Sequence, residues 1–181
     1  MAWTKIKEQT ASNAANVSFI DGTSDVVLDN TYKLYRFCLY DINPATNLAE
    51  FTFQFNAAGA SGFNETITST MFKAHHDEAD SATGVDIAAD EDQAQGTAYN
   101  YLFRDGGNGA DESCAGELYI FNPSGTTYVT HWYSWFNGYQ ADNYSINSFA
   151  AGYVNATAAM DEVDFKMSTG NMDGVISLWG L

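Results

Sequence analysis

The chain has 181 residues, of which 45% are hydrophobic and 15% aromatic, with 15 glycines and 2 prolines. This length predicts one domain, and this composition favours an all-β sandwich and argues against a disordered chain. Seven basic residues stand against 23 acidic ones, which gives a formal charge of -16. Phosphate backbones and anionic membrane surfaces repel such a chain, so nucleic acid is a poor candidate partner.

The N-terminal segment, residues 1–16, is polar and carries Trp3 and Ile6 as its large apolar anchors. We expect it to be an attachment arm that packs on another chain or on the domain, with residues 17–181 forming the β-sandwich. The segment lacks the apolar core of a signal peptide, and no stretch of the chain reaches the ~20 apolar residues of a membrane helix. Synthesis in the cytoplasm, without a signal peptide and without membrane insertion, is therefore expected.

The first predicted strands lie between residues 17 and 56. A short strand over 17–20 is followed by an Asp-Gly turn and a second short strand over 26–28. Residues 32–56 then predict two strands joined by one connection that contains Asn43 and Pro44, because proline removes a hydrogen-bond donor. In the second of these strands, phenylalanines alternate with polar residues, which is typical of a strand with one buried face.

The middle of the chain mixes strands with acidic loops. Threonines at alternate positions predict a strand over 65–72. Residues 74–95 are acidic and weakly patterned, so we expect a long excursion over the surface with one helical turn at 88–94. A strand over 99–103 and a second exposed loop over 105–113 follow.

The C-terminal part predicts a hairpin of two strands, 117–122 and 128–136, joined across Pro-Ser-Gly, and then a strand over 145–154. Apolar and charged residues alternate over 162–167, which predicts another half-buried strand. The apolar strand over 175–181 must be paired, because it would otherwise be an adhesive edge.

Strands at a spacing of ~8–12 residues predict a single-domain, antiparallel β-sandwich that is jelly-roll-like. An internal echo agrees with this fold, since segments 40–55 and 153–167 each contain a strand, an Asn/Ala/Thr turn and an alternating strand. We expect the two alternating strands to face each other across the core of the sandwich. Convergence on favourable turn residues is an alternative explanation of the echo.

Two cysteines are present, Cys38 in a predicted strand and Cys114 in an acidic, glycine-rich loop. A disulfide framework is not expected in a chain kept in the cytoplasm. Two free thiols are therefore the favoured interpretation.

An aromatic run over 131–139 is the main candidate for a binding surface. On an extended strand Trp132 would share one face with Ser134, while Tyr133 and Trp135 would share the other, so one set enters the core and the second must be covered. Core packing together with a subunit interface is the favoured interpretation. The alternative is glycan binding, in which Trp132, Tyr133, Trp135 and Tyr139 stack on sugar rings.

Carboxylates follow two adjacent histidines, and Asp77, Asp80 and Asp86 are candidate ligands for a hard cation such as Ca²⁺. Their spacing is not that of a calcium-binding loop, and adjacent histidines on an extended backbone point to opposite sides, which argues against a shared zinc ion. A solvated acidic loop is the favoured interpretation, and no cofactor is expected.

Catalytic motifs are absent from the sequence, which has no nucleophile elbow, phosphate-binding loop or dinucleotide fingerprint. We therefore expect that the protein is not an enzyme. Glycoside hydrolysis needs two carboxylates ~5–9.5 Å apart in space, a distance that sequence spacing does not reveal. A glycan depolymerase stays open as a less favoured alternative.

Four stretches carry a resemblance to a known class: VSFIDG, INPATNLAEFTFQFNAAGASGFNETITS, ELYIFNPSGTTYVTHW and VDFKMSTGNMDGVISLWGL. On these stretches the sequence resembles virion structural proteins of tailed marine bacteriophages, some of them of tail-fibre type, and the likeness extends over nearly the whole chain. The resemblance implies a β-rich, oligomeric building block displayed on the virion. Its motifs carry no catalytic residues, so none is transferred.

The favoured hypothesis is a non-enzymatic structural protein of a phage virion, acting in host attachment as an adsorption fibre or as a capsid-surface decoration. Its expected partners are copies of itself, in a homotrimer, and other virion proteins. The alternative is a carbohydrate-binding module that recognises a host-surface glycan.

Overall fold

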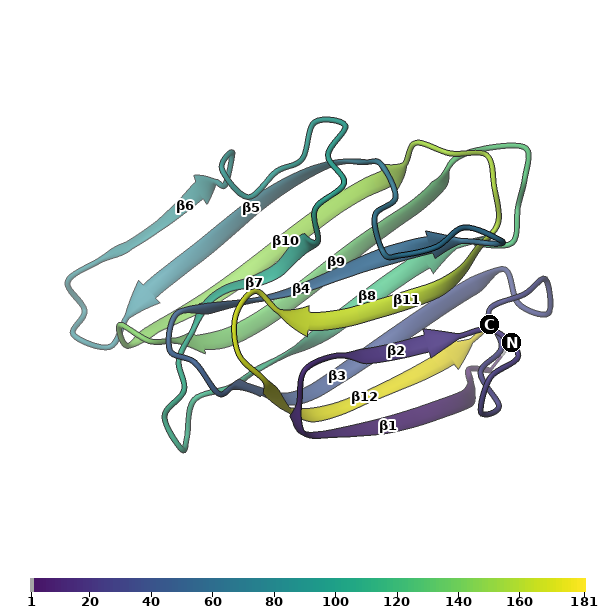
Figure 1. The fold of residues 1–181 in the computed structure, drawn as a ribbon. Helices are drawn as coiled ribbons and strands as arrows, with labels where there is room; N and C mark the ends of the chain where they lie inside the picture. The colour runs from purple at the N-terminus through teal and green to yellow at the C-terminus, as the bar shows by residue number, and fades with distance from the viewer. Residues whose placement is uncertain (1) are drawn as a thin grey trace.

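The computed structural model describes residues 2–181, and these residues form twelve β-strands and no helix (Figure 1). All strand pairs are antiparallel. No helix in the described part of the chain is therefore long and apolar enough to cross a membrane. The strands are β1 (Thr4–Ala14), β2 (Val17–Ile20), β3 (Leu34–Pro44), β4 (Ala49–Ala57), β5 (Ile67–Asp77), β6 (Thr83–Ile87), β7 (Asn100–Gly106), β8 (Cys114–Phe121), β9 (Thr130–Gln140), β10 (Tyr144–Val154), β11 (Met160–Met167) and β12 (Met172–Gly180).

The strands form two layers. The large sheet has the order β1-β12-β3-β8-β9-β10-β5-β6, and the small sheet has the order β7-β4-β11-β2. One residue pair, Gly106 of β7 with Gln140 of β9, links the two sheets. In Figure 1 the small sheet lies across the large one, and β5 and β6 project beyond it. The predicted antiparallel sandwich is confirmed.

The strand order is that of a jelly roll with two insertions. Four strands of the large sheet, in the order β1-β12-β3-β8, match four strands of the small sheet, in the order β2-β11-β4-β7. The two strands at each matching position are consecutive along the chain. This order is the eight-stranded jelly roll. The hairpins β5–β6 and β9–β10 are inserted into it and lengthen the large sheet beyond β8.

Aromatic rings fill the space between the two sheets. Phe165 of β11 lies at their centre, with its ring centroid 5.1 Å from that of Phe37 and 6.1 to 6.4 Å from those of Phe19, Phe51 and Phe53. All five side chains are at most 1% exposed. Edge-to-face and offset contacts of this kind stabilise a core beyond the burial of apolar area alone.

Strands β4 and β11 are neighbours in one sheet, so the expectation that they face each other across the core was wrong. Phe53 pairs with Phe165 and Phe55 pairs with Val163. The internal echo nevertheless has a structural counterpart, because β3–β4 and β10–β11 each pass from the large sheet to the small one. For the same reason residues 32–56 are not a hairpin.

The polar face of β4 is also buried, contrary to the alternating pattern. Gln54 is 0% exposed, and its amide donates hydrogen bonds to the carbonyl oxygens of Ala98 at 2.8 Å and Glu65 at 3.1 Å. Two loops therefore cover the outer side of the small sheet. The buried amide of Gln54 is tolerated because loop carbonyl oxygens accept its hydrogen bonds.

The N-terminal segment belongs largely to the sheet. Residues 4–14 form edge strand β1, which pairs with β12. Ile6 packs against the core, and the Trp3 ring lies over the Arg36 guanidinium at 4.5 Å and against Tyr119 at 6.2 Å. Residue 16 is therefore not a boundary between an arm and the sandwich. The C-terminal strand β12 is paired on both sides, as expected.

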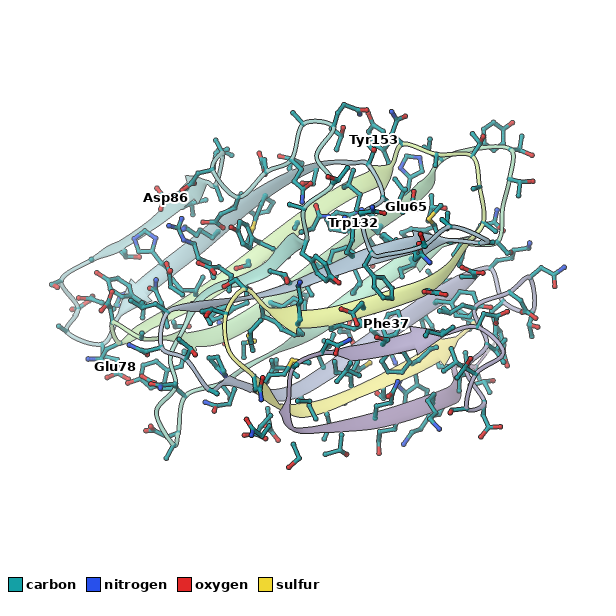
Figure 2. The ribbon with its side chains drawn as sticks, viewed as in Figure 1. Phe37, Glu65, Glu78, Asp86, Trp132 and Tyr153 are labelled. Atoms are coloured by element: carbon teal, nitrogen blue, oxygen red, sulfur yellow. The ribbon has the colours of Figure 1, made fainter. Side chains whose placement is uncertain are left out.

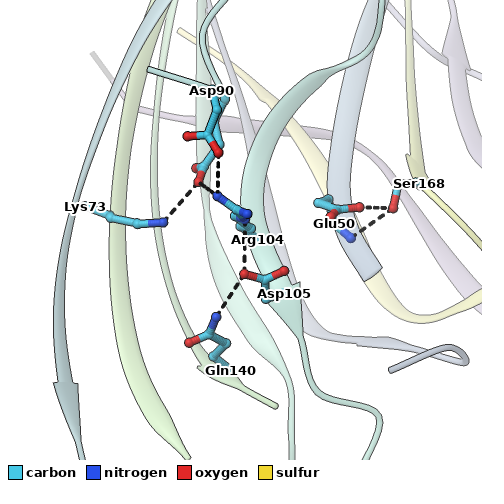
Figure 3. Close-up of polar contacts among 8 residues, drawn as sticks. Glu50, Lys73, Asp90, Arg104, Asp105, Gln140 and Ser168 are labelled. Carbon is cyan, nitrogen blue, oxygen red and sulfur yellow. Dashed lines mark hydrogen bonds and ion pairs between the residues drawn. The ribbon is translucent and has the colours of Figure 1, made fainter. Parts of the chain in front are cut away.

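The acidic stretch 74–95 is more ordered than its sequence predicts. Strand β5 continues to Asp77, strand β6 pairs with it, and residues 88–94 form no helix. The buried carboxylate of Glu91 accepts hydrogen bonds from Arg104 at 2.7 Å and from Lys73 at 3.0 Å (Figure 3). The Glu91 hydrogen bond raises the pKa of Arg104. This network ties the loop to β5 of the large sheet and β7 of the small one.

Both cysteines are buried and free, as expected. Burial raises the pKa of both thiols. Neither side chain is therefore a reactive thiolate near neutral pH.

We predict that Glu91→Ala lowers the free energy of unfolding by about 2–3 kcal/mol, because Lys73 and Arg104 are left without their shared buried partner. Urea unfolding followed by far-ultraviolet circular dichroism measures the change. The control is Glu8→Ala in the exposed Lys5–Glu8 pair, which should cost less than about 0.5 kcal/mol. Equal effects of the two substitutions would contradict a structural role for the Glu91 network.

Candidate functional site

Strand β9 presents aromatic side chains to both sides of the large sheet. Trp132 and Phe136 point into the core and are at most 2% exposed, whereas Tyr133 and Trp135 point outward and are 41% and 54% exposed. The predicted alternation is thus confirmed. Trp132, however, packs against Phe53 with ring centroids 4.8 Å apart and lies between the sheets (Figure 2), so its proposed contact with a glycan was wrong.

The outward rings of β9 belong to a larger surface, which we call the outer aromatic face. It lies on the side of the large sheet that the small sheet does not cover. Its rings come from four strands, β5, β8, β9 and β10, at outward positions of each strand. The face comprises Phe72, Tyr119, Phe121, Tyr133, Trp135, Phe149 and Tyr153.

One row of this face crosses three strands in register. Trp135 lies opposite Phe149, and Phe149 lies opposite Phe72. The ring centroids are 5.3 and 5.0 Å apart, with interplanar angles of 17° and 13°. Because the spacing matches the distance between strands, the three rings stand upright on the sheet as a stack. The Trp135 indole N–H donates to the Asn147 side-chain oxygen at 2.5 Å, which fixes the ring further.

A second row joins β8 to β9. Tyr119 stacks on Tyr133 with centroids 4.7 Å apart and an interplanar angle of 14°. The Tyr119 hydroxyl donates to Glu117 at 2.7 Å, and Arg36 pairs with the same carboxylate at 3.2 Å. Burial, followed by the hydrogen bond to Glu117, raises the pKa of Tyr119. The phenol is therefore neutral at physiological pH.

Each row ends in an open ring face beside small residues. On its β8 side, away from Phe149, Trp135 borders a hollow of about 330 Å³ together with Ala115, Gly116 and Glu117 of β8. The face of Tyr133 that is turned away from Tyr119 borders a hollow of about 450 Å³. The residues around this second hollow are Thr68, Ser69, Thr70, His131, Trp132, Ala151, Gly152 and Tyr153.

Tyr139 lies near the end of β9, apart from these two hollows. Its hydroxyl is 3.2 Å from the Asn143 side-chain oxygen, and a hydrogen bond with Glu78 raises the pKa of its phenol. It borders a third hollow, of about 550 Å³, together with Glu78 and Asp111. Of the four predicted contact residues, Tyr133 and Trp135 therefore lie together and Tyr139 lies in an acidic neighbourhood of its own.

The three candidate cation ligands are divided among separate contacts. Asp77 accepts hydrogen bonds from the backbone amides of Ser81 and Ala82, each at 2.8 Å, and from the Ser81 hydroxyl, which lowers the pKa of its carboxyl group. Asp80 lies 3.4 Å from His76 and Asp86 lies 3.2 Å from His75. Figure 2 shows Asp86 on the outermost strand of the large sheet. Across residues 2–181, no three His, Cys, Asp or Glu side chains are grouped as a metal site.

The sequence did not identify the rings that neighbour β9. Phe72, Tyr119 and Phe149 occupy outward positions of their strands, but none of these strands contains an aromatic run like that of β9. Strand pairing brings them into rows. The alternation within each strand indicates which side chains share a face. It does not reveal the register between strands, which decides which rings become neighbours.

Comparison with known protein families and curated proteins identified no relative of this chain. No protein-family model matches the chain, and no similar sequence was found among curated proteins.

We predict that two adjacent tryptophan positions differ sharply in their effect on stability. Trp132→Ala should lower the free energy of unfolding by about 3–5 kcal/mol, because it leaves a cavity between the sheets. Trp135→Ala should cost less than about 1 kcal/mol, because its ring is more than half exposed. Urea denaturation of both variants measures the difference, and a larger loss for Trp135→Ala would contradict the assigned inner and outer faces.

Proposed function

We propose that this protein is a non-enzymatic structural subunit of a bacteriophage virion and serves in an adsorption fibre or as a capsid-surface decoration. The observation that carries the proposal is the outer aromatic face, on which stacked rings remain uncovered outside a complete sandwich core. Exposed aromatic clusters of this kind are typical of surfaces that bind a partner. The virion setting rests on the resemblance of residues 17–22, 42–69, 117–132 and 163–181 to phage virion proteins.

The fold suits a displayed building block. Jelly rolls occur among viral capsid proteins and lectins, although the fold alone does not define a function. The rings of the outer aromatic face stand on paired strands and not on loops, so they are held in place before a partner arrives. The formal charge of -16 favours solubility over non-specific association.

Self-association is part of the proposal. Strand β6 pairs with β5 along one side, and its Val85 and Ile87 side chains are 72% and 73% exposed. An edge strand with bare apolar side chains and without lysine or proline is prone to pair with another chain. We assign this edge to a heterologous contact in a homotrimer, in which β6 of one copy meets a different surface of the next copy, because pairing of two identical edges would close as a dimer.

A mass measurement tests the assembly. Size-exclusion chromatography with light scattering should give about three times the chain mass of 19.8 kDa. The double substitution Val85→Lys, Ile87→Lys should give a folded monomer, because charged side chains block edge pairing. Lys replacement of Thr23 and Thr127, which are exposed and lie in loops outside every edge strand, is the matched control. A monomeric wild-type protein would contradict the proposed assembly.

Purified particles test the virion role. In cells infected by a phage that encodes this chain, the protein should co-purify with intact particles through a density gradient, at a constant ratio to the major capsid protein by mass spectrometry. Antibodies raised against the recombinant chain should also label the particle surface in negative-stain images. A protein that is abundant in the lysate and missing from the gradient-purified particles would refute the proposed role.

A further inference from the structure

Two hollows of the outer aromatic face flank strand β9, one on each side. The first opens towards β8 beside Trp135, and the second opens towards β10 beside Tyr133. In each hollow an aromatic ring has one face packed on a neighbouring ring and the other face open. Small residues beside the open face leave room for a flat ligand ring, since Ala115 and Gly116 border the first hollow and Ala151 and Gly152 the second.

Polar groups surround the open ring faces. Glu117, Asn137 and Asn147 border the hollow at Trp135. Hydroxyl groups of Thr68 and Thr70 border the hollow at Tyr133. Amides and hydroxyls can both donate and accept hydrogen bonds, whereas carboxylates accept them. A flat apolar wall with such groups around it matches a ring that has apolar C–H groups on its face and hydroxyls at its edge.

Charge narrows the choice of ligand. Lys and Arg are absent from the described residues that border the two hollows. The nearby guanidinium of Arg36 is paired with Glu117 and covered by Trp3. Together with the formal charge of -16, this disfavours phosphorylated or sulfated ligands at the two hollows. A neutral ligand avoids this repulsion.

From this combination we infer that the outer aromatic face binds a neutral polysaccharide, with one sugar ring stacked on Trp135 and another on Tyr133. Both hollows are open to solvent and lie on one sheet face, which suits a long chain that runs across the strands. The inference rests on the proposed function, since it names the ligand class of the same surface. If the inference is correct, the virion attaches to its host through a neutral glycan on the host surface.

Affinity electrophoresis tests the inference with the full chain. Native gels containing dextran, laminarin, yeast mannan or arabinogalactan supply neutral polysaccharides, and a gel containing alginate supplies an anionic one. At least one neutral polysaccharide should retard the wild-type protein. Trp135→Ala and Tyr133→Ala should each weaken that binding about tenfold or more, because stacking on one aromatic ring contributes this much in comparable complexes of flat rings.

Two further variants test whether a loss of binding is specific to the outer aromatic face. Ala151→Gln keeps both rings but fills the hollow beside Tyr133, so it should also weaken binding at least about fivefold through exclusion of the sugar ring. Tyr128→Ala removes an 81% exposed tyrosine outside the outer aromatic face and should leave binding unchanged. Thermal unfolding confirms that each variant is folded.

The outcomes separate the two proposals. Retardation by no neutral polysaccharide, retardation by alginate alone, or equal loss in Tyr128→Ala would overturn the glycan inference. A chain that is present in purified particles and fails these gels would keep its virion role and lose its glycan ligand. A chain that binds a neutral polysaccharide and is missing from particles would keep its glycan ligand and lose its virion role.

Discussion

The structure depends on the aromatic packing around Phe165, where rings from both sheets meet. Phe37 of the large sheet and Phe51 and Phe53 of the small one contact this ring and are almost fully buried. Burying such rings stabilises the sandwich by removing apolar area from water and by edge-to-face contacts. The contact fixes which side of each strand faces inward. Within residues 2–181, no second layer covers the opposite side of the large sheet.

That constraint explains where the candidate site lies. A strand has a period of two, so once Trp132 enters the core, Tyr133 and Trp135 must point away from it. The inserted hairpins β5–β6 and β9–β10 place further outward rings, Phe72 and Phe149, in register with Trp135. The stacked rows are thus a consequence of strand pairing. The recognition role that we propose for them uses a surface that the core packing leaves free.

The sequence predicted those elements in which apolar residues alternate strongly. The phenylalanines of β4 and the alternation in β11 are examples, and the hairpin of β8 and β9 was also predicted. Strand β6 was missed because nearly all of its side chains are exposed and it is held only through its pairing with β5, so no apolar period marks it. The loop at 88–94 was wrongly expected to form a helical turn, because its order comes from the distant partners Lys73 and Arg104 of Glu91.

The candidate site was predictable only in part, for a related reason. Alternation over 131–139 separated two sets of aromatic side chains, but both sets are apolar enough to enter a core, so the inward set was not identified and Trp132 was included among the contacts. Which set of side chains faces the core is decided by pairing between strands that are far apart in the chain. Phe72 and Phe149 are separated by more than 70 residues, and their contact follows from the register of β5 with β10.

A recognition surface displayed by a virion must be accessible on the assembled particle. Cryo-electron microscopy of intact particles, at a resolution that shows side chains, tests whether the outer aromatic face is such a surface. We expect multiple copies of this sandwich on the particle, with Trp135 and Tyr133 turned towards the surrounding medium. Copies whose outer aromatic face is buried against another virion protein, or particles that lack the chain, would contradict it.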